Sequence, residues 1–146
     1  FVMKHYDLLQ KYLSNLEVLN IKLHNIHWNV VGKQFMAVHE FTEKLYDGMF
    51  EQLDEVAELL KMKGIMPLAT LAEYLEHASI KEIKAKDFAI EEALEIVKKD
   101  LEAMKELATT IRNEADEAGD FETVAKFEDY VAEYSKNIWF IDAMLK

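Results

Sequence analysis

Residues that interrupt helices are rare in this chain and stand far apart. Its 146 residues include four glycines, Gly32, Gly48, Gly64 and Gly119, and one proline, Pro67. This spacing leaves room for helices of roughly 25 residues and excludes the many turns of an all-β fold. Because 51% of the residues are hydrophobic, the chain can bury one core, and we expect a single domain over residues 1–146.

Apolar residues recur at spacings of three, four and seven in four long stretches, the pattern of helices that bury one face. The first stretch ends near Gly32, the second runs over about 35–62, and the third and fourth follow the capping residues Asp87 and Asp120. The core positions expected from this spacing are Leu9, Leu13, Leu16, Leu23, Ile26, Val30, Val38, Leu45, Met49, Leu53, Val56, Leu60, Ile90, Leu94, Val97, Leu101, Met104, Ala108, Ile111, Phe121, Val124, Phe127, Tyr130 or Val131, Tyr134, Ile138 and Ile141.

The connections between these helices predict their topology. Short turns near Gly32 and Gly119 make the first and second helices, and the third and fourth, antiparallel neighbours. About two dozen residues separate the second from the third, far more than adjacent helices need. They include a short helix to about His77, opened by a capping box of Thr70 and Glu73. We therefore predict an all-α, ferritin-like four-helix bundle with one long crossover.

Composition limits the chemistry and the location. Without cysteine, any metal must bind nitrogen and oxygen ligands. A formal net charge of −11 disfavours a surface that binds nucleic-acid phosphates and suits one that binds cations. There is no membrane-length apolar run or signal peptide, so we expect a soluble cytoplasmic protein without a membrane partner.

Candidate metal ligands lie on the predicted second helix. None of the five histidines follows a glutamate by three residues, so the Glu-x-x-His pairs usual in ferritin-like di-iron bundles are absent. The helix instead offers His39 with Glu43 and Asp54 with Glu58. Each pair is four residues apart and shares one face, where two side chains can meet one cation.

The two pairs belong to a second stripe, about 100° around the helix from the apolar stripe. Their midpoints are roughly 22 Å apart along the axis, too far for one copy of the helix to bring both to one metal. An antiparallel copy related by a two-fold axis near Gly48 would bring them together. Since a helical glycine costs about 1 kcal/mol, we interpret Gly48 as a close approach of the two helices. The stripe consists of His39, Glu43, Tyr46, Phe50, Asp54 and Glu58.

Further histidines and a tryptophan lie beside this stripe. His27, near the end of the first helix, can add a nitrogen to the His39 half, and the combined ligand set suits Fe(II) or Zn(II). Taken singly, each residue would be an ordinary surface or interior residue. Trp28 is expected to pack, with electron donation to an oxidising metal as the alternative role. We expect His24 to have a local packing or hydrogen-bonding role and His5 and His77 to lie at the surface.

Three segments resemble the Dps family, the mini-ferritins named as DNA-binding proteins from starved cells. The segment "LHNIHWNVVGKQFMAVHE" is similar to the family signature H-W-x-x-x-G-x-x-F-x-x-x-H-E, "LDEVAELL" to its D-x-x-A-E segment, and "PLATLAEYLEHASI" to its crossover helix. The resemblance implies hollow dodecamers of ferritin-like bundles, in which ferroxidase centres at two-fold interfaces take ligands from both subunits.

By this resemblance, His27, His39 and Glu43 of one subunit join Asp54 and Glu58 of its partner in a ferroxidase centre with at most two iron positions. Zinc is expected as a competitor because it takes the same nitrogen and oxygen ligands. The family oxidises Fe(II), typically with hydrogen peroxide in preference to dioxygen, and stores the ferric product as mineral, which protects against oxidative damage. Many members have aspartate in place of Glu43. The acids Asp116, Glu117, Asp120 and Glu122 are candidates for iron pores at three-fold axes, with surface solvation as the alternative.

Two other functions compete with iron oxidation. One is a DNA-condensing stress protein associated with the nucleoid. Family members that condense DNA often carry lysine-rich tails, whereas this acidic chain has only Lys4 and Lys11 near its start, so we expect little DNA binding. The other is a structural oligomer whose metal site stabilises the interface without turning iron over.

Overall fold

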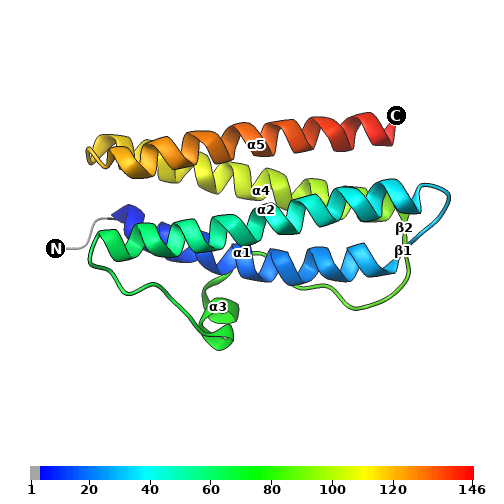
Figure 1. The fold of residues 1–146 in the computed structure, drawn as a ribbon, viewed down its shortest axis with the longest axis horizontal. Helices are drawn as coiled ribbons and strands as arrows, with labels where there is room; N and C mark the ends of the chain where they lie inside the picture. Colours follow the sequence, from blue (N-terminus) through cyan, green and yellow to red (C-terminus); the bar gives the residue numbers. More distant parts are fainter. Residues whose placement is uncertain (1–3) are drawn as a thin grey trace.

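The computed structural model of the protein describes residues 4–146, and residues 1–3 of the predicted domain lie outside the described residues. The chain forms four long helices and one short helix within the described residues, and Figure 1 shows the long helices side by side with the short one set apart from them. The predicted all-α bundle is confirmed. Its elements are α1 (Lys4–Asn29), β1 (Val30–Val31), α2 (Phe35–Met62), α3 (Leu71–His77), β2 (Phe88–Ala89), α4 (Ile90–Glu117) and α5 (Phe121–Leu145).

The chain connects these helices as the spacing of the breakers predicts. Helices α1 and α2 pack as one pair and α4 and α5 as another, and the segment that contains α3 runs from one end of the bundle to the other (Figure 1). A short parallel bridge was not predicted: Val30 of β1 pairs with Phe88 of β2, and Val31 pairs with Ala89. The bridge joins the first turn to the end of the crossover.

Gly32 is required by this turn. Its φ of 136° is open to glycine, and a Cβ there would stand 2.8 Å from Cγ1 of Ile90. Any side chain would therefore be strained in the backbone and would also collide with the first residue of α4. The predicted helix stop at Gly32 is thus also a contact point between the two helix pairs.

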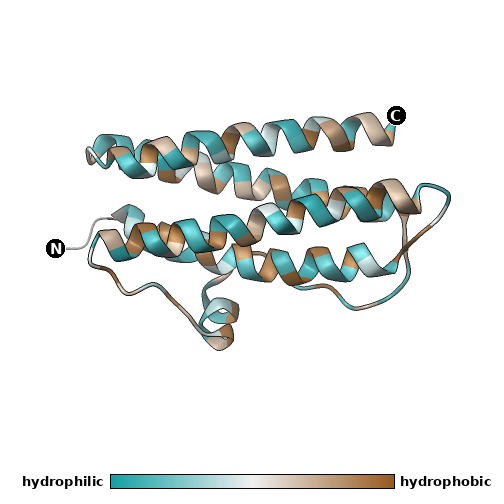
Figure 2. Cartoon of the chain, in the orientation of Figure 1, coloured by the Kyte–Doolittle hydropathy of each residue, from teal (hydrophilic) through white to brown (hydrophobic). Residues whose placement is uncertain are grey.

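The core follows the predicted apolar positions, with one clear exception. Leu13, Leu101 and Phe127 are fully buried, and each such side chain contributes about 1.5–3 kcal/mol relative to an exposed one. Along each long helix, apolar and polar segments alternate (Figure 2). The prediction for Phe121 was wrong, because this side chain is 75% exposed and Thr123 is buried instead. A bilayer-spanning helix needs a long, nearly uncharged apolar stretch, and none of the helices in residues 4–146 has one.

Side-chain amides of α1 hold the crossover against the bundle. Gln10 donates to the carbonyl of Met66 and accepts from the amide of Leu68. Asn15 accepts from the backbone amides of Ser79 and Ile80. Further along the helix, Asn25 donates to the carbonyl of Ile83. Because the crossover is mostly irregular, these contacts satisfy backbone groups that have no helical partner.

Asp120 links three elements at the other end of the bundle. Its carboxylate accepts from Nζ of Lys63 at 2.7 Å and from Nε2 of His5 at 2.9 Å. It also accepts from the hydroxyl and backbone amide of Thr123, and so caps α5 as predicted. The prediction that His5 lies at the surface was wrong: the side chain is 1% exposed, because its partner Asp120 satisfies its nitrogen inside the packed end of the bundle.

These partners determine how Asp120 responds to pH. Burial alone would raise its pKa, but the hydrogen bonds from Lys63, Thr123 and His5 outweigh it and lower the pKa from 3.8 to about 2. Because the pKa of Asp120 is lower in the folded protein than in the unfolded chain, its ionised carboxylate stabilises the fold fully at pH values above the unfolded-state pKa. This stabilisation is lost as the pH falls towards 2.

We expect Asp120→Asn to lower the free energy of unfolding at pH 7 by about 2 kcal/mol, the equivalent of the pKa shift. The deficit should shrink as the pH falls below about 4, because the wild-type carboxyl then becomes protonated as well. Urea unfolding at neutral and acidic pH measures both effects. The exposed loop residue Asp87 provides the control Asp87→Asn, and a deficit for Asp120→Asn that does not depend on pH would contradict the assignment.

Candidate metal site

The end of α1 and the start of α2 are joined by a reciprocal pair of histidines. Nδ1 of His27 donates to the backbone carbonyl of His39 at 2.7 Å, and Nδ1 of His39 donates to the carbonyl of His27 at 2.8 Å. The two rings lie nearly parallel, with centroids 3.6 Å apart and planes inclined by 14°. We call His27 and His39 the histidine pair.

These hydrogen bonds fix which nitrogen of each ring is free. A carbonyl can only accept, so in the neutral ring Nδ1 carries the proton and Nε2 keeps its lone pair. Burial lowers the pKa of His27 and so favours its neutral form. Metal-ligating histidines are usually oriented by such a bond to the other ring nitrogen. The backbone carbonyls therefore orient both rings, so that the Nε2 atoms of the histidine pair are the ones left to bind a metal.

A carboxylate and two aromatic rings surround the histidine pair. Oε1 of Glu43 lies 3.9 Å from Nε2 of His27, and the Glu43 side chain is about half exposed. Tyr46 meets His27 edge-on at 5.2 Å, and Phe35 stacks on His39 at 4.9 Å. Because of burial and its negatively charged neighbours, chiefly Glu43, the pKa of Tyr46 is raised, so the phenol stays neutral.

Other predicted residues lie nearby with different roles. His24 stacks on Tyr46 at 3.8 Å and donates Nδ1 to the carbonyl of Asn20, the local role that was expected. Trp28 is 66% exposed, although packing was predicted for it. Its ring lies 5.4 Å from that of His24. His77 is exposed on α3, as predicted.

One polar residue in contact with this group was missed from the sequence. Thr42 is fully buried and donates its hydroxyl to the carbonyl of Val38. Its oxygen lies 3.2 Å from Nδ1 of His27, so it fills the space behind the imidazole. The only signal in the sequence was its position three residues after His39, on a turn otherwise occupied by apolar and charged residues.

The second predicted carboxylate pair stands apart from the histidine pair. Asp54 and Glu58 are exposed on α2. Within residues 4–146, no three His, Asp or Glu side chains of one chain gather closely enough to hold a metal ion. The structure thus contains two separate half-sets of ligands, one at the buried to half-buried histidine pair with Glu43 and one at the exposed Asp54 and Glu58, the arrangement for which a site shared between two copies is predicted.

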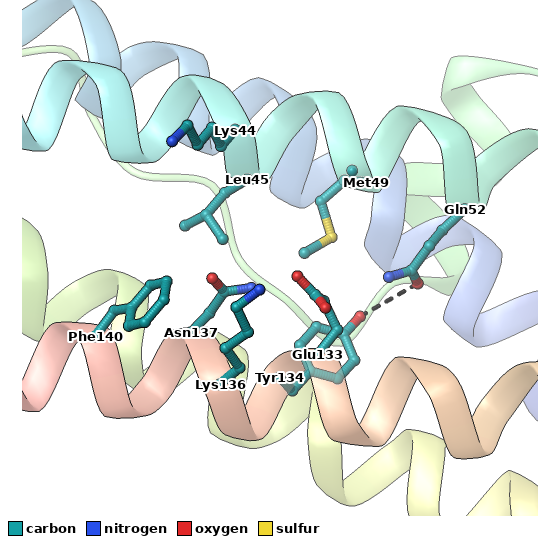
Figure 3. Close-up of a pocket in the computed structure, with 10 residues that line it drawn as sticks. Lys44, Leu45, Met49, Gln52, Glu133, Tyr134, Lys136, Asn137 and Phe140 are labelled. Atoms are coloured by element: carbon teal, nitrogen blue, oxygen red, sulfur yellow. Dashed lines mark hydrogen bonds between the residues drawn. The ribbon is translucent and has the colours of Figure 1, made fainter.

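The interpretation of Gly48 was wrong. Gly48 lines a pocket with Phe140 and Asn137 of α5 (Figure 3). At about 100° per residue, it points roughly 150° away from the centre of the stripe. The glycine is therefore turned towards the bundle, on the side of α2 opposite the candidate metal ligands.

The predicted pore acids also differ from one another. Asp120 is engaged with Lys63, His5 and the first turn of α5, as described above. Asp116 lies 3.8 Å from Arg112, while Glu117 and Glu122 are exposed around the turn between α4 and α5. Solvent or an ion can therefore reach Asp116, Glu117 and Glu122.

Comparison with known proteins points to one family. The model of the ferritin-like domain matches residues 6–146. The DNA protection during starvation protein of Helicobacter pylori is 32% identical over 143 residues, which cover 98% of this chain and 99% of the relative.

Solved structures agree with this match. The crystal structure of Helicobacter cinaedi CAIP superposes with a TM-score of 0.95 at 35% identity, over 98% of this chain and 100% of the other. A Dps protein from Vibrio cholerae O1 is described as a member of a broad superfamily of ferritin-like diiron-carboxylate proteins. Its crystal structure superposes with a TM-score of 0.92 at 28% identity, over 98% of this chain and 89% of the other.

The state of the histidine pair can be tested in solution. We expect the metal-free protein to carry the proton on Nδ1 in both His27 and His39, and the midpoint of His27 titration to lie below 6.5 because burial lowers its pKa. Two-dimensional ¹H–¹⁵N spectra that resolve ring tautomers measure both. The exposed His77 is the internal reference. An Nε2-protonated ring, or a His27 midpoint above 6.5, would contradict the geometry.

Proposed function

This chain belongs to the Dps branch of the ferritin-like family, and on that premise we propose that it oxidises Fe(II) at sites shared between two copies and stores the ferric product. The observation that carries the proposal is the histidine pair, whose Nδ1 atoms are held by backbone carbonyls so that both Nε2 atoms are left to bind a metal. Iron is the substrate in this scheme, and zinc is a competitor for the same nitrogen and oxygen ligands.

The ligands divide between the copies by their position on α2. In the proposal, His27, His39 and Glu43 come from one copy, and Asp54 and Glu58 come from an antiparallel partner. Support comes from the exposure of all three carboxylates in the single chain. Charge also supports it, because three carboxylates offset most of the charge of two Fe(II) ions.

The proposed reaction couples two electrons to one molecule of peroxide. Two Fe(II) ions give up one electron each, the O–O bond of hydrogen peroxide breaks, and two protons from solvent complete two molecules of water. Hydroxyl radical is avoided when both electrons arrive together. The carboxylates favour the ferric product, since hard oxygen ligands suit the higher charge. Dioxygen is the alternative oxidant.

Assembly completes the proposal. We infer a homo-oligomer, by resemblance a dodecamer, in which the mineral is enclosed. Of the four acids first considered for iron entry, Asp116, Glu117 and Glu122 are retained, because the carboxylate of Asp120 is occupied by partners within the chain.

A complementation experiment tests the shared site. His39→Ala and Asp54→Ala are each expected to lose fast peroxide-driven Fe(II) oxidation, measured by stopped-flow absorbance after anaerobic loading. When the two variants are co-expressed in equal amounts, half of the dimers are mixed, and each mixed dimer keeps one intact site of two. The rate should therefore recover to about a quarter of wild type.

A control and two outcomes complete this test. Glu102→Ala changes an exposed carboxylate of α4, on a different helix from the stripe, and should leave the rate unchanged. Recovery in the mixture is incompatible with a site built within one chain. Loss in both variants without recovery would refute sharing, and equal slow rates in all proteins would support a structural metal site without turnover.

DNA protection is the second candidate, favoured by the name of the Helicobacter pylori relative. The net charge of −11 opposes it, because DNA binding is dominated by phosphate contacts from cations. We expect no salt-sensitive complex in a gel shift with duplex DNA at low ionic strength. A shifted band that dissolves as salt is raised would contradict this expectation and favour a DNA-condensing role.

A further inference from the structure

A pocket of about 190 Å³ lies between α2 and α5. Figure 3 shows Leu45 and Met49 of α2 and Asn137 and Phe140 of α5 directed into the space between the helices, while Lys44 lies along α2 at the rim. The pocket is on the side of α2 away from the candidate metal ligands, and no part of the proposed iron chemistry uses it. Its volume suits an ion of a few heavy atoms, since pockets for drug-sized ligands are about 300–1,000 Å³.

Gly48 keeps this pocket open. In the middle of a helix, glycine costs about 1 kcal/mol relative to alanine. Close packing does not explain the glycine, because a Cβ built there meets no heavy atom within 4 Å among the described residues. A longer side chain would enter the pocket, which gives the unfavourable residue a reason to be there.

The floor of the pocket presents a hydrogen-bond donor. Oε1 of Gln52 accepts from the hydroxyl of Tyr12, and the hydroxyl of Tyr134 donates to Tyr12 and lies 3.4 Å from the same Oε1. Burial raises the pKa of both tyrosines, so they remain neutral donors. With its oxygen occupied, Gln52 turns its amide nitrogen towards Met49 and Glu133 (Figure 3). That nitrogen can only donate to a ligand.

The walls add cations and one carboxylate. Lys44 of α2 and Lys136 of α5 both line the pocket, together with the amide of Asn137 and the carboxylate of Glu133. In a chain of net charge −11, two ammonium groups at one small pocket run against the prevailing charge. Ammonium groups only donate and an ionised carboxylate only accepts. The complementary ligand is therefore an anion with several acceptor oxygens and one hydroxyl group.

We propose that the pocket between α2 and α5 binds a small oxyanion that retains one hydroxyl group, with hydrogen phosphate as the first candidate. Its oxygens accept from Lys136 and the Gln52 amide, its hydroxyl donates to Glu133, and Lys44 at the rim adds positive charge. Sulfate has the same shape but no proton at neutral pH, so it leaves Glu133 facing a bare oxygen. Bicarbonate also carries one hydroxyl and is the alternative source of this chemistry.

Calorimetric titration of the iron-free protein with inorganic phosphate, sulfate and bicarbonate at equal ionic strength tests the proposal. We expect saturable binding of one phosphate or bicarbonate per chain, and sulfate weaker by about tenfold or more, the effect of one hydrogen bond to a charged group. Whichever of phosphate and bicarbonate binds more tightly is then identified as the ligand. Equal binding of sulfate, or no saturable binding of any of the three, would overturn the proposal.

Variants locate the site and its selectivity. Gly48→Met should fill the pocket and remove binding, whereas Glu51→Met on the exposed side of α2 should not. Glu133→Gln should bring the affinities for phosphate and sulfate within about twofold of each other, because the amide of glutamine can donate its N–H groups to either ion. Lys136→Gln should weaken phosphate binding by about tenfold. The control Lys61→Gln, which changes a lysine of α2 outside the pocket, should leave phosphate binding unchanged. Wild-type affinity in Gly48→Met would place the ion elsewhere and refute the site.

Gly48→Ala separates binding from folding. The added methyl group fits the open space and improves helix propensity, so this variant should unfold at a higher temperature than wild type. It should nevertheless bind phosphate more weakly, because the methyl group narrows the pocket. Unchanged affinity in the stabilised protein would count against the role assigned to Gly48.

Discussion

The long crossover depends on one constraint, which is that its backbone groups must find hydrogen-bond partners outside a helix. Gln10, Asn15 and Asn25 of α1 supply them at three levels along the bundle. Together with α2 and α4, the crossover covers α1, which is buried on most sides. A central helix held in this way sets the positions of both helix pairs, including the level at which His27 meets α2.

The histidine pair shows how the fold prepares a metal ligand. The acceptors of both Nδ1–H groups are main-chain carbonyls of the facing helix, so the ring orientations are set by helix packing and not by the metal. Such preorganisation reduces the ordering that a metal must impose on its ligands. The carboxylates Asp54 and Glu58 are exposed, so helix packing does not set their orientation as it does for the histidine rings.

The long helices and their order could be predicted because each has an apolar stripe and a capping or stop signal, as at Gly32 and Gly119. The prediction that Asp87 caps the third long helix was wrong, because the N-cap of α4 is Ala89, and the bridge that places this start joins residues distant in sequence. His5 and Gly48 were misjudged for a similar reason. His5 contacts Asp120, the N-cap of α5, and Gly48 lines a pocket with residues of α5. The sequence near His5 or Gly48 contains no pattern that predicts these contacts. The sharing of ligands between copies stays a prediction.

The bridge between β1 and β2 has a consequence for the route of folding. Each helix pair is closed by a short turn and can form from contacts local in sequence, which assemble fast. The bridge instead joins Val30 to Phe88, so its formation must close a loop that contains all of α2 and α3. Loop closure of that length carries an entropic cost before any contact compensates it. The two hairpins are therefore expected to form first, and the joining of their ends should be the late, rate-limiting event.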